Sequence, residues 1–407
     1  MANTIKLGNG NWATKEGSLL AYNDENNNFK PLPFTTTRAS SATVVNKQGL
    51  IETVGSGIPR IDFSDDANGA LLLEPASTNL VTYSEDFSDA SWTKGGTSVT
   101  SGFVSPDGTL NADKITPTGI NEAHQIYQNK TITSNQSYTI SAFMKFGGYR
   151  YLECRETFGG KGIGFDTTTQ TFYGINTPTS FKGVILKNGW VRMEATYTSI
   201  GTSAFFLLYS TPILMNPTFL GDGTSGVYTW GAQLEENSYS TSYIKTVGTV
   251  QTRVADTASG SGNSTVINST EGVLYAEISA LGDGGVRMIS ISDGSINNQV
   301  SFEYSVVTNL IRIRLISGGD EKSFYQSTNY DYLQYHKIAI SYKLNNFKVF
   351  IDGINVYTDT DSIMPINLNE LSFANGINGF PFYGNTKDLR VYNTALSDAE
   401  LISLTTI

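Results

Sequence analysis

Hydrophobic and polar residues alternate with a period of two along most of the chain, and helical periodicity is nearly absent. The clearest case lies near the C-terminus, where Ile338, Ile340 and Tyr342 share one face of an expected strand. Asn345-Asn346 then tolerates the positive φ of a tight turn, and Asp352-Gly353 marks a second turn after another alternating stretch. This pattern predicts a meander of antiparallel strands.

The same alternation predicts strands in the middle of the chain, at residues 138–146, 149–155, 190–197, 204–209 and 227–234. Short strands without helical connectors are typical of β-sandwiches and jelly rolls. One helix is expected near the C-terminus, because Ser397 and Glu400 have the spacing of a capping box and Leu401 and Leu404 would share its buried face. We therefore expect an all-β protein with two tandem antiparallel β-sandwiches (jelly rolls), preceded by an irregular or small β N-terminal region.

The chain has 407 residues, which suits two or three domains that each bury a core of their own. The polar, flexible stretch from Thr257 to Thr265 is the clearest linker. We expect a middle jelly roll over residues 81–250, a linker over residues 251–270 and a C-terminal sandwich over residues 271–407. Residues 1–80 would form an attachment or assembly region, and an N-terminal extension of the middle sandwich is the alternative.

A net charge of -10 argues against nucleic acid as a partner, because phosphate binding requires clusters of Lys and Arg. No apolar run approaches the roughly 20 residues that span a bilayer, so membrane insertion is not expected. The first residues lack the apolar region of a signal peptide. Cys154 is the single cysteine, which excludes an internal disulfide, and we expect it to be a small buried hydrophobe.

Several segments near the C-terminus have a familiar order. They are Glu271-Gly-Val-Leu-Tyr-Ala-Glu-Ile, Lys337-Ile-Ala-Ile-Ser-Tyr, Phe350-Ile-Asp-Gly and the closing run Lys387-Asp-Leu-Arg-Val-Tyr-Asn-Thr-Ala-Leu-Ser-Asp-Ala-Glu-Leu. Together they resemble laminin-G-like, concanavalin A-like domains over residues 271–407. The resemblance implies a β-sandwich that often carries calcium at its rim. His336 departs from the family pattern, because many members carry Trp at this place.

The rest of the chain carries a second resemblance. Its segments are Arg38-Ala-Ser-Ser-Ala-Thr, Gly49-Leu-Ile-Glu, Pro59-Arg-Ile-Asp-Phe, Leu71-Leu-Leu-Glu-Pro-Ala-Ser-Thr-Asn-Leu, Val227-Tyr-Thr-Trp-Gly-Ala-Gln-Leu-Glu, Ser240-Thr-Ser-Tyr-Ile-Lys-Thr and Gln251-Thr-Arg-Val-Ala-Asp. They resemble phage tail and structural proteins that contain jelly-roll carbohydrate-binding modules. The resemblance implies a bacteriophage protein at the virion surface, with other virion proteins and cell-surface polysaccharide as partners. In that setting a homo-oligomer is expected, and a trimer is our prediction.

Sugar binding requires flat aromatic faces that stack on sugar rings, together with amides and carboxylates that bond to hydroxyls. In the middle domain the candidates are Trp92, Tyr149, Tyr151 and Tyr173. Trp230 lies in phase with Tyr228 and Leu234, and Trp190 follows Asn188-Gly189 at a strand start, so we expect both tryptophans to pack in the core. The C-terminal domain has a cluster that would line a binding rim or contact a neighbouring subunit, formed by Tyr325, Tyr330, Tyr332, Gln334 and Tyr335. A mixed strand and loop with solvated tyrosines is the alternative.

Asp359 and Asp361 are the candidate calcium ligands, and ordinary turn chemistry is the alternative for both. For catalysis, the chain lacks the Glu-x-Asp-x-x-Glu motif of concanavalin A-like endoglucanases, the G-x-S-x-G elbow and the H-E-x-x-H helix. Gln334-Tyr-His336 is similar to the Gln-x-His of some alginate lyases, but the other strand motifs of those enzymes are missing. We interpret His336 as a residue at a strand edge and assign no catalytic residue.

These observations favour a non-enzymatic virion surface protein that binds host or environmental glycans through its β-sandwiches. Capsid decoration, head fibre and tail component all fit this description. Two alternatives remain at this point: a phage polysaccharide depolymerase, lyase or hydrolase, on a concanavalin A-like fold, and a purely architectural decoration protein.

Overall fold

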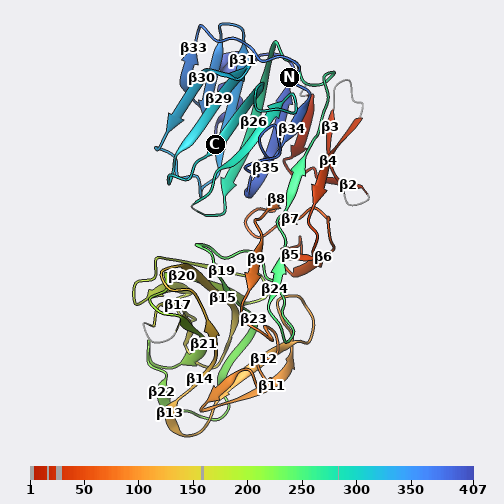
Figure 1. The fold of residues 1–407 in the computed structure, drawn as a ribbon. Helices are drawn as coiled ribbons and strands as arrows, with labels where there is room; N and C mark the ends of the chain where they lie inside the picture. Colours follow the sequence, from red (N-terminus) through yellow and green to blue (C-terminus); the bar gives the residue numbers. More distant parts are fainter. Residues whose placement is uncertain (1–3, 16–17, 24–29, 157–159, 283) are drawn as a thin grey trace. The chain divides into compact units, whose positions relative to one another are not determined.

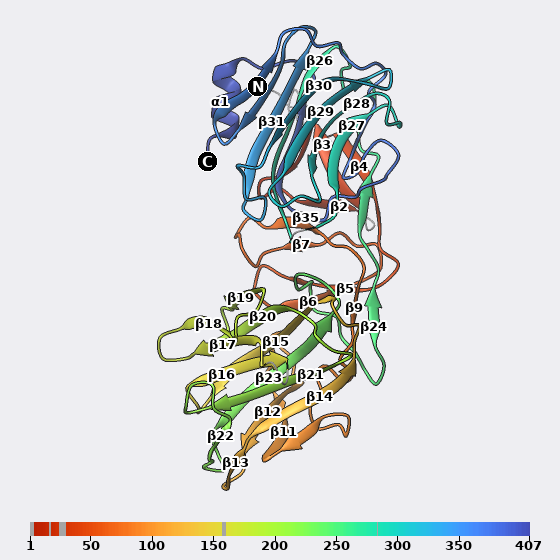
Figure 2. The ribbon, with the colours of Figure 1, turned by 60° about the vertical axis from the view of Figure 1, so that its left-hand side comes forward.

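The computed structural model describes residues 4–15, 18–23, 30–156, 160–282 and 284–407. The chain divides into two compact units, and each unit collects separate stretches of the sequence. Unit 1 contains residues 1–41, 54–75 and 255–407, and unit 2 contains residues 42–53 and 76–254. Both units consist of antiparallel strands (Figures 1 and 2), which confirms the prediction of an all-β protein with antiparallel sandwiches.

Unit 1 is a sandwich of two sheets. Among the described residues the larger sheet has 12 strands, with the main order β25 (Thr257–Ser259), β4 (Lys30–Thr37), β3 (Ser18–Asn23), β1 (Ile5–Gly8), β35 (Gly384–Tyr392), β26 (Glu271–Ala280), β31 (His336–Lys343), β32 (Phe347–Ile351) and β33 (Ile354–Asp359). Three further strands of this sheet are β2 (Ala13–Lys15), which pairs with β3, β8 (Ala70–Leu73), which pairs with β35, and β7 (Ile61–Asp62), which pairs with β8. The facing sheet has the order β30 (Asp320–Ser327), β29 (Ile311–Ser317), β28 (Gln299–Tyr304), β27 (Arg287–Ser292) and β34 (Glu370–Ser372).

Strand β26 is buried on both of its faces. Leu274, Ala276 and Ile278 belong to the core between the two sheets of unit 1. Val273 and Tyr275 alternate with them and belong to a second apolar cluster, which also contains a residue of the C-terminal helix. A strand that packs on both faces reads as a nearly continuous apolar run, which explains the sequence of this segment.

Helix α1 (Asp398–Thr405) contributes Leu401 to that second cluster. Its N-terminus has the predicted capping box: the hydroxyl of Ser397 accepts from the N–H of Glu400 at 3.4 Å, and the Glu400 carboxylate accepts from the N–H of Ser397 at 2.8 Å. The prediction of this helix is confirmed. Within the described ranges, no helix is long and apolar enough to cross a membrane.

The first 75 residues are shared between the two units. Strand β1 pairs with β35, with Leu7 opposite Leu389, so the beginning of the chain extends the larger sheet of unit 1. The range expected to be a linker contains β25, which pairs with β4, and Ala258 is buried in the core of unit 1. Alternation within a segment does not reveal these pairings, because each joins stretches that lie far apart in the sequence.

Unit 2 is a sandwich of two sheets with six strands each in the described residues. The first has the order β10 (Thr93–Gly95), β14 (Gln125–Thr131), β21 (Ser203–Thr211), β16 (Tyr151–Glu156), β17 (Gly162–Asp166) and β18 (Thr171–Ile175). The second has the order β11 (Thr97–Phe103), β12 (Ala112–Pro117), β23 (Gly226–Glu235), β15 (Ser137–Gly147), β20 (Trp190–Thr198) and β19 (Ser180–Ile185). Three short pairs complete the unit: β13 (Asn121–Ala123) with β22 (Thr218–Leu220), β9 (Ser77–Asn79) with β24 (Gln251–Arg253), and β5 (Ala42–Val45) with β6 (Ile51–Val54).

The core of unit 2 lies between its two six-stranded sheets and includes Met144 of β15 and Cys154 of β16. Burial raises the pKa of the Cys154 thiol, so the thiol stays protonated and unreactive, as expected for a small buried hydrophobe. Trp190 and Trp230 lie with Phe143 in a separate buried cluster, which confirms that both tryptophans pack inside the protein.

Candidate ligand-binding site

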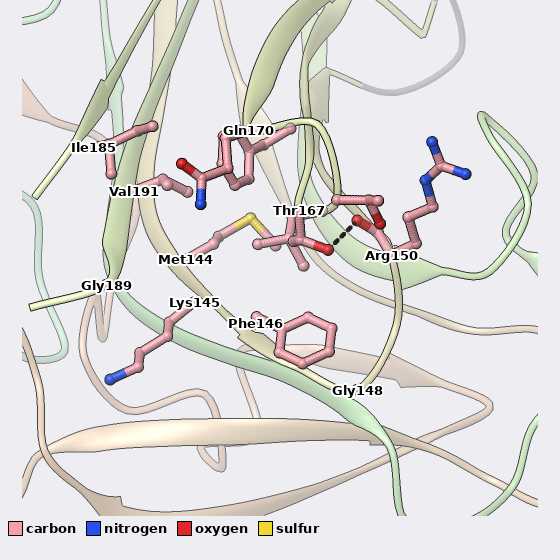
Figure 3. A pocket seen from close by; sticks show the side chains of 13 residues that line it. Met144, Lys145, Phe146, Gly148, Arg150, Thr167, Gln170, Ile185, Gly189 and Val191 are labelled. Carbon is pink, nitrogen blue, oxygen red and sulfur yellow. Dashed lines mark hydrogen bonds between the residues drawn. The ribbon is translucent and has the colours of Figure 1, made fainter.

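Unit 2 contains a hollow of about 480 Å³ between the ends of several strands (Figure 3). The end of β15, the connection from β15 to β16, the turn between β17 and β18, and the turn between β19 and β20 surround it. Four inward-facing side chains of the sandwich form its apolar lining: Met144, Leu152, Phe165 and Val191. The hollow is therefore an outward continuation of the core of unit 2.

Phe146 gives the hollow an aromatic wall. It occupies the inward phase of β15 two residues after Met144, but the strand has passed the end of the core there, so Phe146 is 53% exposed. Ile185 is another exposed apolar residue of the lining. An apolar lining with an accessible ring is the usual basis of a small-molecule site.

Polar groups lie around this apolar surface. Figure 3 shows Gln170 and Thr167 on one side of the hollow and Phe146 on the other. The Thr167 hydroxyl donates to the carbonyl oxygen of Arg150 at 2.9 Å. Lys145 Nζ donates to the carbonyl oxygen of Asn188 at 3.1 Å, and no carboxylate within the described ranges forms an ion pair with it. The lining thus offers an amide and a hydroxyl group to a ligand.

Arg150 and Asp166 fix the turn beside the hollow. The guanidinium binds the carboxylate through two bonds, Nε to Oδ1 at 2.9 Å and Nη2 to Oδ2 at 2.7 Å. Asp166 also accepts the N–H of Thr168 at 2.9 Å. The hydrogen bond from Arg150, supported by backbone donors, holds the pKa of Asp166 well below its usual range. The guanidinium carbon lies 4.9 Å from the centre of the Tyr151 ring. Arg150 therefore both lines the hollow and contacts a tyrosine of the neighbouring sheet face.

The structure brings together two of the four aromatic candidates of the middle domain. The rings of Tyr151 and Tyr173 meet edge to face with their centres 6.4 Å apart, and both are partly buried. Tyr149 is buried, and its hydroxyl accepts the N–H of Asp222 at 3.1 Å. Trp92 is 1% exposed in the core, where its indole N–H donates to the carbonyl oxygen of Tyr83 at 3.0 Å. Neither Trp92 nor Tyr149 has a ring face free for a sugar, because both rings are covered.

A buried carboxylate that the sequence reasoning missed organises the face beside Tyr151. Glu153 is fully buried and accepts from the hydroxyls of Tyr173, at 2.9 Å, and Tyr209, from Arg155 and from the N–H of Met215, at 3.0 Å. Burial and the neighbouring Glu153 raise the pKa of Tyr173. The period-two spacing of Tyr151, Glu153 and Arg155 signals a shared face, but alternation alone does not show that this face is covered.

The predicted aromatic cluster of the C-terminal domain is brought together only in part. Tyr325 and Tyr330 are both partly buried against the core of unit 1, and burial, followed by interaction with Tyr325, raises the pKa of Tyr330 to about 12. Tyr332 is fully buried and stacks on Tyr304 with ring centres 5.1 Å apart, so it does not line a rim. The ring of Tyr335 lies under Lys387 Nζ at 3.9 Å, and Gln334 is exposed.

The polar candidates of this domain have local partners. His336 is the first residue of β31; its Nδ1 lies 2.6 Å from Asp352 Oδ2 and its Nε2 lies 3.0 Å from the carbonyl oxygen of Asp331. Asp359 Oδ1 accepts the N–H of Asp361 at 2.9 Å, which is the geometry of turn chemistry. The described part of the chain contains no group of three or more His, Cys, Asp or Glu side chains placed to hold a metal ion.

Comparisons with known proteins give a family match in the C-terminal part. Residues 274–402 match the model of the Laminin_G_3 family, described as the concanavalin A-like lectin/glucanases superfamily. No curated protein sequence matches the chain.

Among solved structures, a carbohydrate-binding module (CBM40) of the Ruminococcus gnavus IT-sialidase, bound to α2,3-sialyllactose, is 16% identical (37% of this chain, 94% of that chain, TM-score 0.31). Domain 4 of the arabinanase AbnA from Geobacillus stearothermophilus, in complex with arabinotriose, is 14% identical (42% and 84%, TM-score 0.30). Domains LG4-5 of the mouse laminin α1 chain are 12% identical (68% and 91%, TM-score 0.24). The family match thus falls within residues 271–407, the range whose sequence resembles laminin-G-like, concanavalin A-like domains.

Proposed function

We propose that the protein binds glycans through its β-sandwich units and that the hollow of unit 2 is the principal site. The carrying observation is that the half-exposed ring of Phe146 shares one hollow with the hydrogen-bonding groups of Thr167 and Gln170. A sugar presents C–H faces that pack on aromatic rings and hydroxyls that need donors and acceptors, so both requirements are met in one place.

We also propose the setting: a non-enzymatic surface component of a bacteriophage particle, as capsid decoration, head fibre or tail component. The support is the similarity of the N-terminal and middle segments to phage proteins. Its partners would be other virion proteins, further copies of the same chain and cell-surface polysaccharide. Many copies on one particle would convert individually weak sugar contacts into strong attachment.

The test compares glycan binding by the full chain with binding by two phenylalanine variants. Phe146→Ala removes the wall of the hollow, whereas Phe181→Ala removes a ring of similar exposure (47%) in the same unit that does not line the hollow. On an array of bacterial polysaccharides, followed by calorimetry with the best ligand, Phe146→Ala should lower the affinity about tenfold, or about 1.4 kcal/mol. Phe181→Ala should bind like the unaltered protein.

Equal affinity of the two variants would contradict the placement of the site in the hollow. Failure of the unaltered protein to bind any glycan of a broad panel would favour a purely architectural role. Release of shorter chains from the bound polysaccharide would favour the depolymerase alternative, in which case His336→Ala should abolish the release.

A further inference from the structure

Arg287, the first residue of β27 in unit 1, is a buried cation that forms no ion pair with any residue that the structure describes. The residue is 3% exposed, its Nη1 atom has no hydrogen-bond partner, and no carboxylate of the described residues forms an ion pair with it. Arg38 and Arg60 are also buried in unit 1, but each of them binds Asp256. Buried charges in proteins are normally paired, so Arg287 requires an explanation.

The register of the sheet defines where the Arg287 side chain lies. Arg287 stands opposite Tyr304 of β28, so both side chains project from the same face, which is the face of the core. The Tyr304 ring stacks on Tyr332 and lies 5.9 Å from Phe382, centre to centre. Burial raises the pKa of Tyr304, and the charge of Arg287 acts in the opposite direction, so the guanidinium is within electrostatic range of the phenol. The Arg287 side chain therefore lies on the core face of the sandwich, at a place where the rings of Tyr304, Tyr332 and Phe382 gather.

One acidic group near this end of the core, Asp352, is already bound by other residues. The charge of Asp352 also reaches Tyr304, but its carboxylate is held by His336 Nδ1 at 2.6 Å and by the N–H of Lys337 at 3.0 Å. The Asp352 carboxylate is thus bound by His336 and Lys337 at the start of β31. A guanidinium left without a partner in this setting disfavours folding, and a bound anion would remove that penalty.

An exposed aromatic residue lies beside the strand that carries Arg287. The N–H of Met288 donates to the carbonyl oxygen of Phe380 at 3.0 Å, and Phe380 is 53% exposed. The backbone of Phe380 has a φ of 53°, a conformation that side-chain-bearing residues rarely adopt. Such strain is often kept at binding sites, where it presents a side chain in one fixed position.

We propose that Arg287 anchors an anion site that binds the carboxylate of an acidic sugar, with Phe380 as the surface for the sugar ring. A guanidinium offers parallel N–H donors that match the two oxygens of a carboxylate. This site belongs to unit 1, whereas the hollow belongs to unit 2. Only the assignment of the anion to a sugar depends on the proposed glycan-binding function.

The test measures thermal unfolding of the full chain in a low-salt zwitterionic buffer with added acetate, glucuronate or glucose. Both acids should raise the unfolding temperature, glucuronate more than acetate, and glucose should have no effect through this site. Arg287→Leu should unfold at a higher temperature than the unaltered protein without added anion and should lose the response to both acids. Arg312→Leu removes a less buried arginine, which is paired with Glu303 at 2.8 Å, and should keep the response.

An unaltered protein that does not respond to either acid, or an Arg287→Leu variant that responds equally, would overturn the anion site. A response to acetate but not to glucuronate would overturn the assignment to a sugar. Asp283 lies outside the described residues, so Asp283→Asn is included, and a response confined to that variant would identify Asp283 as the counter-charge and refute the proposal.

If Arg287→Leu does not fold, Arg287→Lys should fold and bind glucuronate more weakly, because an ammonium cannot form two parallel bonds. Glycan binding in the hollow is measured separately through Phe146, so failure of one proposal is distinguishable from failure of the other.

Discussion

At the scale of single residues, burial rather than residue type decides which aromatic side chain is able to contact a ligand. Trp92 has the side chain that sugar sites favour, but it lies 1% exposed in the core of unit 2. Phe146 was not a candidate, yet its ring is accessible because β15 continues past the core. The Gly147-Gly148 pair marks the end of that strand in the sequence, and it was the signal from which the exposure of Phe146 could have been predicted. The sequence pattern did not point to Gln170, because a turn side chain leaves no periodic trace, and the role of Tyr151 and Tyr173 in sugar binding stays a prediction.

The pair Arg150–Asp166 leads to a prediction about pH. The pKa of Asp166 is lowered in the folded protein, first by the hydrogen bond from Arg150, so its ionised form stabilises unit 2 above the ordinary carboxyl pKa of about 3.9. That stability is lost as the pH falls below about 4 towards the folded-state pKa. Arg150→Gln should raise the pKa of Asp166 towards the ordinary value, and its cost in stability should shrink as the pH falls.

Titration of the Asp166 carboxyl carbon by NMR, with urea unfolding at pH 7 and pH 3, measures both effects. Asp222 is the internal control, because its pKa is lowered by Ser225 and by backbone N–H donors rather than by an arginine. The pKa of Asp222 should be the same in both proteins. An unchanged pKa of Asp166 in the Arg150→Gln variant would contradict the prediction.

At the scale of elements, signals that act between neighbouring residues predicted the structure well. Asn345 has a φ of 54°, and Asp352 and Gly353 have φ values of 50° and 82°, so both predicted turns of the β31–β32–β33 meander are present. The strand β25 was not predicted, because it is recognised only through its pairing with β4, more than 200 residues away. Local chemistry encodes turns and caps, whereas a polar strand depends on its distant partner.

The cap of α1 gives a prediction at this scale. Ser397→Ala removes the acceptor for the N–H of Glu400 and should lower the free energy of unfolding of unit 1 by about 1 kcal/mol. Ser403→Ala is the matched control in the same helix; Ser403 is exposed and Ala is the better helix former, so this variant should lose no stability. Denaturant unfolding measures both variants. Equal losses would show that the cap contributes nothing specific.

At the scale of the whole molecule, four segments from distant parts of the sequence meet in one buried ion-pair network. Arg38 Nη1 lies 2.9 Å from Asp256 Oδ1, Arg60 Nη1 lies 2.5 Å from Glu74 Oε2, and Arg60 also binds Asp256. All four side chains are nearly inaccessible to solvent, and their charges balance. Each lies close in sequence to a point where the chain passes between the units. Each of the four segments is visible in the amino-acid sequence. No single segment, however, specifies which residues of the other segments its charged side chain will bind.

This arrangement predicts that residues 271–407 do not fold alone, although they contain the whole match to the laminin-G-like family. In the full chain β35 pairs with β26 on one side and with β1 and β8 on the other. The fragment would expose that second side of β35 and would lack the apolar side chains of Ile5, Leu7 and Leu71 in the core. Thermal unfolding followed by circular dichroism should show no cooperative transition for the fragment, and addition of residues 1–80 as a separate polypeptide should restore one. A fragment that unfolds cooperatively at the temperature of unit 1 would show that β26, β31 and their neighbours are sufficient, and that the N-terminal strands are additions to a complete domain.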